Sequence, residues 1–156
     1  MISRHLHACG AVAVPFAGSC LCGAVTFEVT GSLRPVINCH CGQCRKWTGH
    51  YVAATAAWKQ DLHVHDSCVA LTWYRSSDQA QRGFCKKCGS SLFWQRDDAD
   101  TITILAGSID GRTGLATKAE IYIDDKGDYY NLEFPQVDTF KQSGHNVRLS
   151  RGGSSE

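Results

Sequence analysis

The chain has almost no excess of charge of either sign, because sixteen Lys and Arg stand against fifteen Asp and Glu, a net charge of +1 at pH 7. It therefore lacks a uniform field that would attract nucleic acid or an anionic membrane surface, and we expect neither as a partner. No apolar run approaches the roughly 20 residues that span a bilayer. No unit of sequence repeats along the chain. These absences leave a soluble globular protein as the expectation.

A secretion signal is also missing from the first residues. Residues 1–17 contain one Arg and several apolar side chains, but no hydrophobic run long enough to act as a signal. The interruptions are His5, His7, Cys9, Gly10 and Pro15. We therefore expect the protein in the cytoplasm, where thiols stay reduced.

Short alternating segments, and no long amphipathic helix, dominate the rest of the sequence. Residues 25–30 alternate apolar and polar side chains, with Val25, Phe27 and Val29 on one face, as in a half-buried strand. Similar short strands are predicted at 36–38, 51–58, 70–74, 91–94, 101–105 and 120–123. Short helices are predicted only at 43–47 and 136–142.

This pattern predicts a mainly β fold, with antiparallel sheets arranged as a sandwich or an open barrel. A length of 156 residues suits one domain with one core. We expect a zinc-binding domain over residues 16–142, preceded by an N-terminal extension, 1–15, and followed by a disordered tail, 143–156.

Cysteine is the residue that the chain has in unusual number, with nine in all. A secreted disulfide framework is one explanation, but the number is odd and the spacing is too close for long-range bridges. Only one or two residues separate the members of four pairs: Cys20 and Cys22, Cys39 and Cys41, Cys41 and Cys44, and Cys85 and Cys88. This spacing is typical of metal knuckles and favours zinc over disulfides.

Four of the cysteines form two knuckles that can close one structural zinc site. They are Cys20, Cys22, Cys85 and Cys88. Gly23 and Gly89 directly follow the knuckles, at positions where the turn often needs a positive φ angle. A site of this kind joins distant segments of the chain and contributes directly to folding.

A second set, Cys39, Cys41 and Cys44, has no fourth cysteine beside it. Three protein ligands and one open position are typical of catalytic zinc, with water or a substrate thiolate as the fourth ligand. The alternative is a closed structural site completed from elsewhere. The candidates for that fourth ligand are His40, His50, His63, His65 and Cys68.

The residues after Cys44 are candidates for substrate binding. A zinc ion with three thiolates has a net formal charge of −1, so an anionic substrate needs nearby cations. Arg45 and Lys46 can supply them, although a solvated basic pair is an equal alternative. Trp47 is a possible contact, and His50 is a candidate for proton transfer.

Three segments resemble the glutathione-dependent formaldehyde-activating enzyme family, which also includes centromere protein V. The segments are Cys-Leu-Cys-Gly-Ala-Val at 20–25, Asn-Cys-His-Cys-Gly-Gln-Cys-Arg-Lys-Trp-Thr-Gly at 38–49, and Phe-Cys-Lys-Lys-Cys-Gly-Ser-Ser-Leu-Phe at 84–93. The likeness extends over about 16–140 and includes Ala-Gly-Ser-Ile-Asp at 106–110.

The resemblance implies a twisted β fold of the kind found in the Rab-binding guanine-nucleotide-release proteins (the Mss-four-like fold). It also implies two zinc sites with the ligand sets given above, the three-cysteine set being catalytic and not necessarily fully occupied. The implied activity is that of a carbon–sulfur lyase, which condenses glutathione with formaldehyde to S-(hydroxymethyl)glutathione. The alternative that the sequence leaves open is a non-catalytic zinc-binding β domain that binds a thiol, a metal or a protein partner.

Overall fold

The computed structural model describes residues 15–132, 137–142 and 149. Most of the expected extension and tail, including Cys9, lies outside these residues. The elements follow in the order β1 (Phe16–Ser19), β2 (Thr26–Val29), β3 (Val36–Cys39), α1 (Gly42–Thr48), β4 (Val52–Trp58), η1 (Lys59–Asp61), β5 (Leu62–His65), β6 (Leu71–Ser77), β7 (Ala80–Cys85), β8 (Ser91–Arg96), β9 (Thr101–Leu105), η2 (Ala106–Ser108), β10 (Thr117–Ile121), η3 (Ile123–Asp125) and β11 (Asp138–Phe140).

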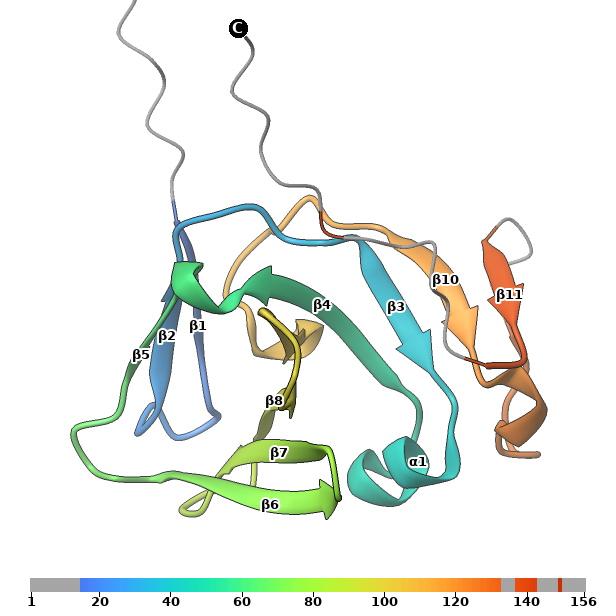
Figure 1. Ribbon diagram of the computed structural model, residues 1–156, viewed down its shortest axis with the longest axis horizontal. Helices are drawn as coiled ribbons and strands as arrows, with labels where there is room; N and C mark the ends of the chain where they lie inside the picture. Colours follow the sequence, from blue (N-terminus) through green and yellow to red (C-terminus); the bar gives the residue numbers. More distant parts are fainter. Residues whose placement is uncertain (1–14, 133–136, 143–148, 150–156) are drawn as a thin grey trace, which may run out of the picture.

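The strands form two sheets that do not close into a barrel (Figure 1). The small sheet has the order β1-β2-β5, and the large sheet has the order β11-β10-β3-β4-β9-β8-β7-β6. In Figure 1 the small sheet stands at one side, and β10 and β11 lie at the opposite side. The predicted mainly β class is therefore confirmed, in the open arrangement.

Two details of this fold differ from the sequence-based expectation. Strand β10 runs parallel to both of its neighbours, β3 and β11, because long connections bring it back beside β3 in the same direction. The helix predicted at 136–142 is wrong for the part that the structure describes, since Asp138–Phe140 pairs with β10 as a strand. The sheet hydrogen bonds available at the edge of β10 outweigh the weak helical pattern of so short a segment.

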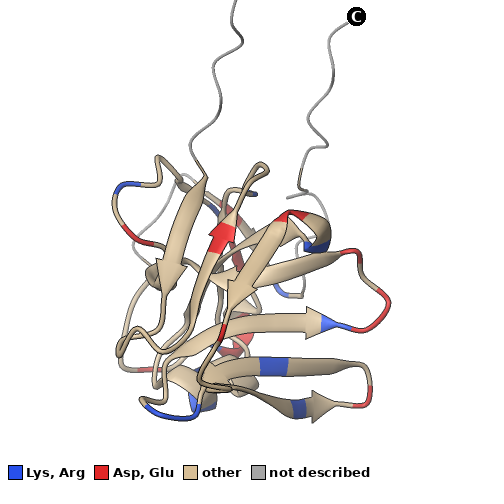
Figure 2. Cartoon of the chain, turned by 90° about the vertical axis from the view of Figure 1, so that its left-hand side faces the viewer, with Lys and Arg blue, Asp and Glu red and all other residues tan. Residues whose placement is uncertain are grey.

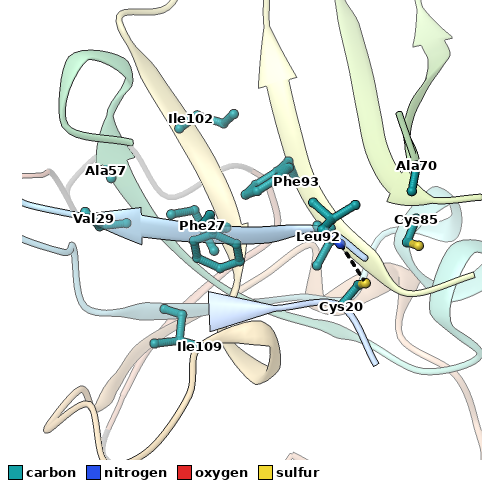
Figure 3. Close-up of a cluster of buried hydrophobic side chains, with 12 residues drawn as sticks. Cys20, Phe27, Val29, Ala57, Ala70, Cys85, Leu92, Phe93, Ile102 and Ile109 are labelled. Carbon is teal, nitrogen blue, oxygen red and sulfur yellow. Dashed lines mark hydrogen bonds between the residues drawn. The ribbon is translucent and has the colours of Figure 1, made fainter. Parts of the chain in front are cut away.

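The main apolar core fills the space between the two sheets. The alternation that predicted β2 places Phe27 and Val29 on its buried face, against Phe93 of β8 and Ile104 of β9. The rings of Phe27 and Phe93 meet edge to face, with centroids 5.2 Å apart (Figure 3). This contact joins the sheets, because the two residues come from opposite layers.

The other face of the large sheet lines a separate space. Along β9, Ile102 and Ile104 point into the main core, whereas Thr103 and Leu105 face the opposite side. Three rows of cross-strand neighbours cover this second face: Arg82, Trp94 and Thr103; Leu105, Ala54 and Ile37; and Val52, Cys39 and Ile121. The second face thus carries one cysteine of the three-cysteine set.

Charged residues are dispersed over loops, strand ends and a few strand positions. Figure 2 shows positive and negative segments interspersed on the face turned to the viewer. In the described part of the chain, no helix is both long enough and apolar enough to cross a membrane.

Candidate functional site

The first cysteine set is held by two tight turns from distant parts of the chain. One follows β1 and the other joins β7 to β8. The backbone N–H of Gly23 donates to the Cys20 carbonyl at 3.0 Å, and that of Gly89 donates to the Cys85 carbonyl at 2.8 Å. The glycines have φ angles of 73° and 78°, which few other residues adopt, as their positions after the knuckles led us to expect.

The four sulfurs of this set lie within 4.8 Å of one another. Zinc–sulfur bonds of about 2.3 Å in a tetrahedron place the sulfurs about 3.8 Å apart. The Sγ atoms of Cys20 and Cys22 are 3.6 Å apart, and those of Cys22 and Cys85 are 3.8 Å apart. These separations are much too long for a disulfide, whose S–S bond is about 2.0 Å. The spacing fits a four-thiolate metal site.

Hydrogen bonds and packing hold these sulfurs in place. The N–H of Val25 donates to Cys20 Sγ at 3.3 Å, a contact drawn in Figure 3. The Ser90 hydroxyl lies 3.2 Å from Cys88 Sγ, and this hydrogen bond is the main reason that the pKa of the Cys88 thiol falls to about 5. Cys20 and Cys85 are buried at one end of the main core, beside Leu92 (Figure 3). A metal here would fasten the small sheet to the β7–β8 turn.

The second set, Cys39, Cys41 and Cys44, lies where β3 ends and α1 begins. Cys39 is the last residue of β3, and Cys41 is the N-cap of α1, accepting the N–H of Cys44 on its sulfur at 3.5 Å. Cys44 is on the first turn of the helix, with its side chain buried. The strand end and the helix start therefore aim three sulfurs at one point, all within 4.8 Å of one another.

Ionisation of one of these three thiols opposes ionisation of the others. The pKa of the Cys41 thiol is lowered to about 2, because Cys39 and Cys44 hydrogen-bond to its sulfur. The pKa of Cys39 is raised well above its usual range, because its proton is held by Cys41 and its deprotonation would place two negative charges side by side. Without a cation, one thiolate is favoured and a second is opposed. A bound dication would allow all three to ionise, which is the behaviour of a metal site.

None of the candidates for a fourth ligand reaches this set among the described residues. Both ring nitrogens of His40 are occupied, Nε2 by the Glu120 carboxylate and Nδ1 by the Tyr130 hydroxyl at 2.7 Å. The other candidates lie elsewhere: His50 beside Tyr51 and Tyr130, His63 and His65 on β5 of the small sheet, and Cys68 exposed before β6. Within the described chain the set therefore offers three candidate ligands to a metal ion and leaves a fourth position open.

A cavity of about 480 Å³ adjoins this open position. The three cysteines form part of its wall, and the second face of the large sheet forms most of the rest, with Trp94, Leu105 and Ile121 among its larger side chains. No Asp, Glu or His is among the described residues that line it. The cavity therefore offers three thiols in mainly apolar surroundings.

Two buried arginines in the cavity wall are site residues that sequence reasoning missed. Arg34 is 9% exposed and Arg82 is 6% exposed. The Nη2 group of Arg82 donates to Gln43 Oε1 at 3.2 Å, and the Cζ atom of its guanidinium lies over the ring of Trp47, 5.7 Å from the centroid. An Arg at an inward-facing strand position was the available signal, but β7 (Ala80–Cys85) had not been predicted as a strand.

The predicted substrate residues lie around this cavity without lining it. Trp47 stacks against Tyr74, and the guanidinium of Arg82 lies over its ring. Lys46 is exposed and borders a separate groove that these three side chains also line. Arg45 is partly buried, with its Nε unpaired among the described residues. His50 borders a separate hollow of about 100 Å³.

A buried polar network stands on the other side of β3. Glu120 of β10 accepts hydrogen bonds from His40 and from Asn38 Nδ2, the latter at 2.8 Å. All three side chains are at most 2% exposed. Because His40 stands between Cys39 and Cys41, the network fastens the cysteine loop to β10.

Comparison with known proteins agrees with this arrangement. Residues 15–125, which contain both cysteine sets, match the family model described as glutathione-dependent formaldehyde-activating enzyme. An uncharacterized lyase of Schizosaccharomyces pombe is 29% identical over 119 residues, which are 75% of this chain and 85% of that protein. A putative glutathione-dependent formaldehyde-activating enzyme of Halomonas elongata is 28% identical over 131 residues, 78% of this chain and 83% of that protein.

A solved structure has the same fold. The crystal structure of a Rhodobacter sphaeroides protein superposes with a TM-score of 0.52 at 28% identity, covering 65% of this chain and 97% of that one. The relatives are named as enzymes, in line with the expected enzyme class. Since the family model covers well over half of the sequence, the chain belongs to the glutathione-dependent formaldehyde-activating enzyme family.

Proposed function

We propose that the protein is a zinc-dependent carbon–sulfur lyase that adds a small thiol, glutathione or one like it, to an aldehyde such as formaldehyde. The observation that carries this proposal is the open three-cysteine set, which faces a cavity large enough for a small organic ligand. The relatives' names, a lyase and a glutathione-dependent formaldehyde-activating enzyme, support the reaction class. Reduced thiols in both sets fit the predicted cytoplasmic location.

Two zinc sites belong to this proposal. Cys20, Cys22, Cys85 and Cys88 would hold a structural ion, and Cys39, Cys41 and Cys44 would hold a catalytic one. When bound, the second ion would lower the pKa of a substrate thiol at its fourth position and so supply the nucleophile at neutral pH.

The reaction itself is an addition. The thiolate sulfur attacks the carbonyl carbon, a C–S bond forms, the C=O π electrons move to oxygen, and that oxygen takes up one proton from solvent. Arg82, whose Nη2 is 3.9 Å from Cys44 Sγ, would stabilise the negative charge that develops on the carbonyl oxygen. Trp94, Leu105 and Ile121 hold the reactants in apolar surroundings, which strengthens that electrostatic effect.

Adduct formation between glutathione and formaldehyde tests this function. The rate should rise above the spontaneous rate in proportion to protein concentration, at matched pH, and should return to the spontaneous rate with Cys41→Ser. An unchanged rate with zinc-loaded wild-type protein would remove the formaldehyde reaction from the proposal.

A second candidate function is binding without turnover. It is favoured by one observation, the lack of Asp, Glu and His among the described residues that line the cavity, which leaves no carboxyl or imidazole group there for proton transfer. A non-catalytic domain would still bind a thiol. Calorimetric binding of glutathione, without any increase in the rate of adduct formation, would favour this candidate.

A further inference from the structure

Arg34 carries a buried positive charge whose hydrogen bonding is incomplete. Its Nη2 donates to the Ala54 carbonyl at 3.2 Å, whereas its Nη1 is buried with no hydrogen-bond partner among the described residues. Burial lowers the pKa of Arg34 to about 10, which still leaves the guanidinium charged at neutral pH. A buried N–H of a charged group that lacks a hydrogen-bond partner costs folding free energy, so an acceptor supplied by a ligand would be bound favourably here.

Arg34 lines the same cavity as the three-cysteine set. Its partner Ala54 pairs with Ile37 across β3 and β4, and Ile37 is two residues before Cys39 on the same face of the strand. Two residues of a strand span about 7 Å. Arg34 therefore contacts the wall of the cavity about two strand residues away from Cys39, so one small ligand can meet both.

Nothing acidic in the described wall neutralises Arg34. Neither Asp nor Glu is found among the cavity-lining residues that the structure describes. The other buried guanidinium, Arg82, already lies against Gln43 and the sulfur of Cys44. Among the described residues, Arg34 is thus a buried cation without an acidic partner in the cavity wall and with one N–H group left without an acceptor.

We propose that Arg34 binds a carboxylate of the substrate and makes the site selective for thiols that carry a carboxylate several bonds from the sulfur. The inference rests on the proposed function, since the thiol must occupy the open position of the three-cysteine set. An Arg–carboxylate contact is charge-assisted and adds geometric specificity. Arg34 is then a specificity-determining residue, while the cysteines act on the sulfur.

A matched pair of thiols tests the assignment. N-acetyl-cysteinylglycine and its C-terminal amide have the same thiol and differ only at the group that would meet Arg34. Isothermal titration calorimetry with the zinc-loaded protein should give a Kd at least tenfold lower for the acid than for the amide. In Arg34→Met the two values should agree within about twofold, because the amide loses little and the acid loses its partner.

The controls separate this idea from loss of the fold or of the proposed function. Arg75→Met removes an exposed arginine paired with Asp97 and should keep the full preference for the acid. Arg34→Lys is the second variant, for the case that Arg34→Met does not fold. It retains the positive charge but not the two-pronged guanidinium, so its preference for the acid over the amide should be smaller than that of the wild type. Equal binding of both thiols to the wild type, or a preference that persists in Arg34→Met, would overturn the role given to Arg34. Either result would leave the proposed thiol site itself in place. If neither thiol binds the wild type, the proposed thiol site fails, and the inference fails with it.

Discussion

The Nη2 of Arg82 lies 3.9 Å from the Sγ of Cys44, so a strand residue places its charge against a cysteine that precedes it by 38 positions. The contact is buried on both sides. Among the influences on the pKa of Cys44, hydrogen bonding from Cys39 lowers it, contact with Cys41 and burial raise it, and the guanidinium lowers it. Arg82 therefore helps the three-cysteine set to lose its protons.

Arg82→Met should weaken metal binding at the three-cysteine set. Without the guanidinium the pKa of Cys44 rises further, and the metal must displace a more tightly held proton. We expect a loss of zinc affinity of about tenfold or more at neutral pH, since charge-assisted contacts contribute about 1.5–3 kcal/mol. The loss should grow as the pH falls. Competition with a chromophoric chelator at several pH values measures it.

Arg75→Met is the matched control, because Arg75 is exposed and its guanidinium pairs with Asp97. One zinc per chain should remain tightly bound in both variants, held by the first set. Zinc affinity that is the same in Arg82→Met and wild type at every pH would contradict the role given to Arg82.

The two cysteine sets should respond differently to the loss of one sulfur. Cys85 is fully buried in the main core and joins distant segments, so Cys85→Ser should lose one zinc and much of the cooperative unfolding transition. Cys41 is partly exposed at the start of α1, and Cys41→Ser should lose one zinc with the fold retained. Metal analysis and thermal unfolding followed by circular dichroism measure both. Unfolding by both variants would make the second set structural and weaken the enzyme proposal.

Glu120→Gln should destabilise the protein through the network behind the cysteine loop. The carboxylate accepts hydrogen bonds from both Asn38 and His40, and an amide can accept with one end only. The buried donor left unpaired costs about 1–3 kcal/mol. Urea unfolding measures the loss.

Tyr130→Phe provides the comparison for this network. It removes only the hydroxyl that contacts His40 Nδ1, at a partly exposed position, and should cost less than Glu120→Gln. A larger loss of unfolding free energy in Tyr130→Phe than in Glu120→Gln would contradict the stabilising role given to the Glu120 hydrogen bonds.

Phe27→Ala should lower the free energy of unfolding, because it removes a contact between the two sheets. Phe27 is 1% exposed, and its ring meets Phe93 of the opposite sheet. Truncation of a buried Phe costs about 3–5 kcal/mol through lost burial and the cavity that remains. Leu21→Ala, at a side chain 88% exposed, should change the free energy of unfolding by less than about 0.5 kcal/mol. Denaturant unfolding of the two variants gives the contrast.

Part of this protein could be predicted from the sequence because the relevant physics is local. Two cysteines separated by one or two residues reach one metal from a single turn, whatever the surrounding fold, and Gly23 and Gly89 relieve the backbone of those turns. Alternation of side chains identified β2, and the short helix predicted at 43–47 is present as α1 (Gly42–Thr48). The convergence of each cysteine set in space follows the predicted grouping.

The fold shows where local reasoning ends. The strands β1, β5, β7 and β11 were not predicted, because they are short, mostly lack clear alternation and depend on neighbouring strands. The parallel pairing of β10 depends on where the chain returns to the sheet, which no local pattern records.

The sequence by itself determined the two cysteine groups, their resemblance to a family and the β class. Tertiary structure decided which face of the sheet meets those cysteines, and so brought Arg34 and Arg82 into their cavity while it directed His40 and Glu120 to the other side of β3. The physical reason is that the residues next to a charged side chain in the sequence do not reveal whether that side chain lies in a site. Its role follows from burial and from which partners remain unpaired, and both depend on strand pairings between residues far apart in the chain.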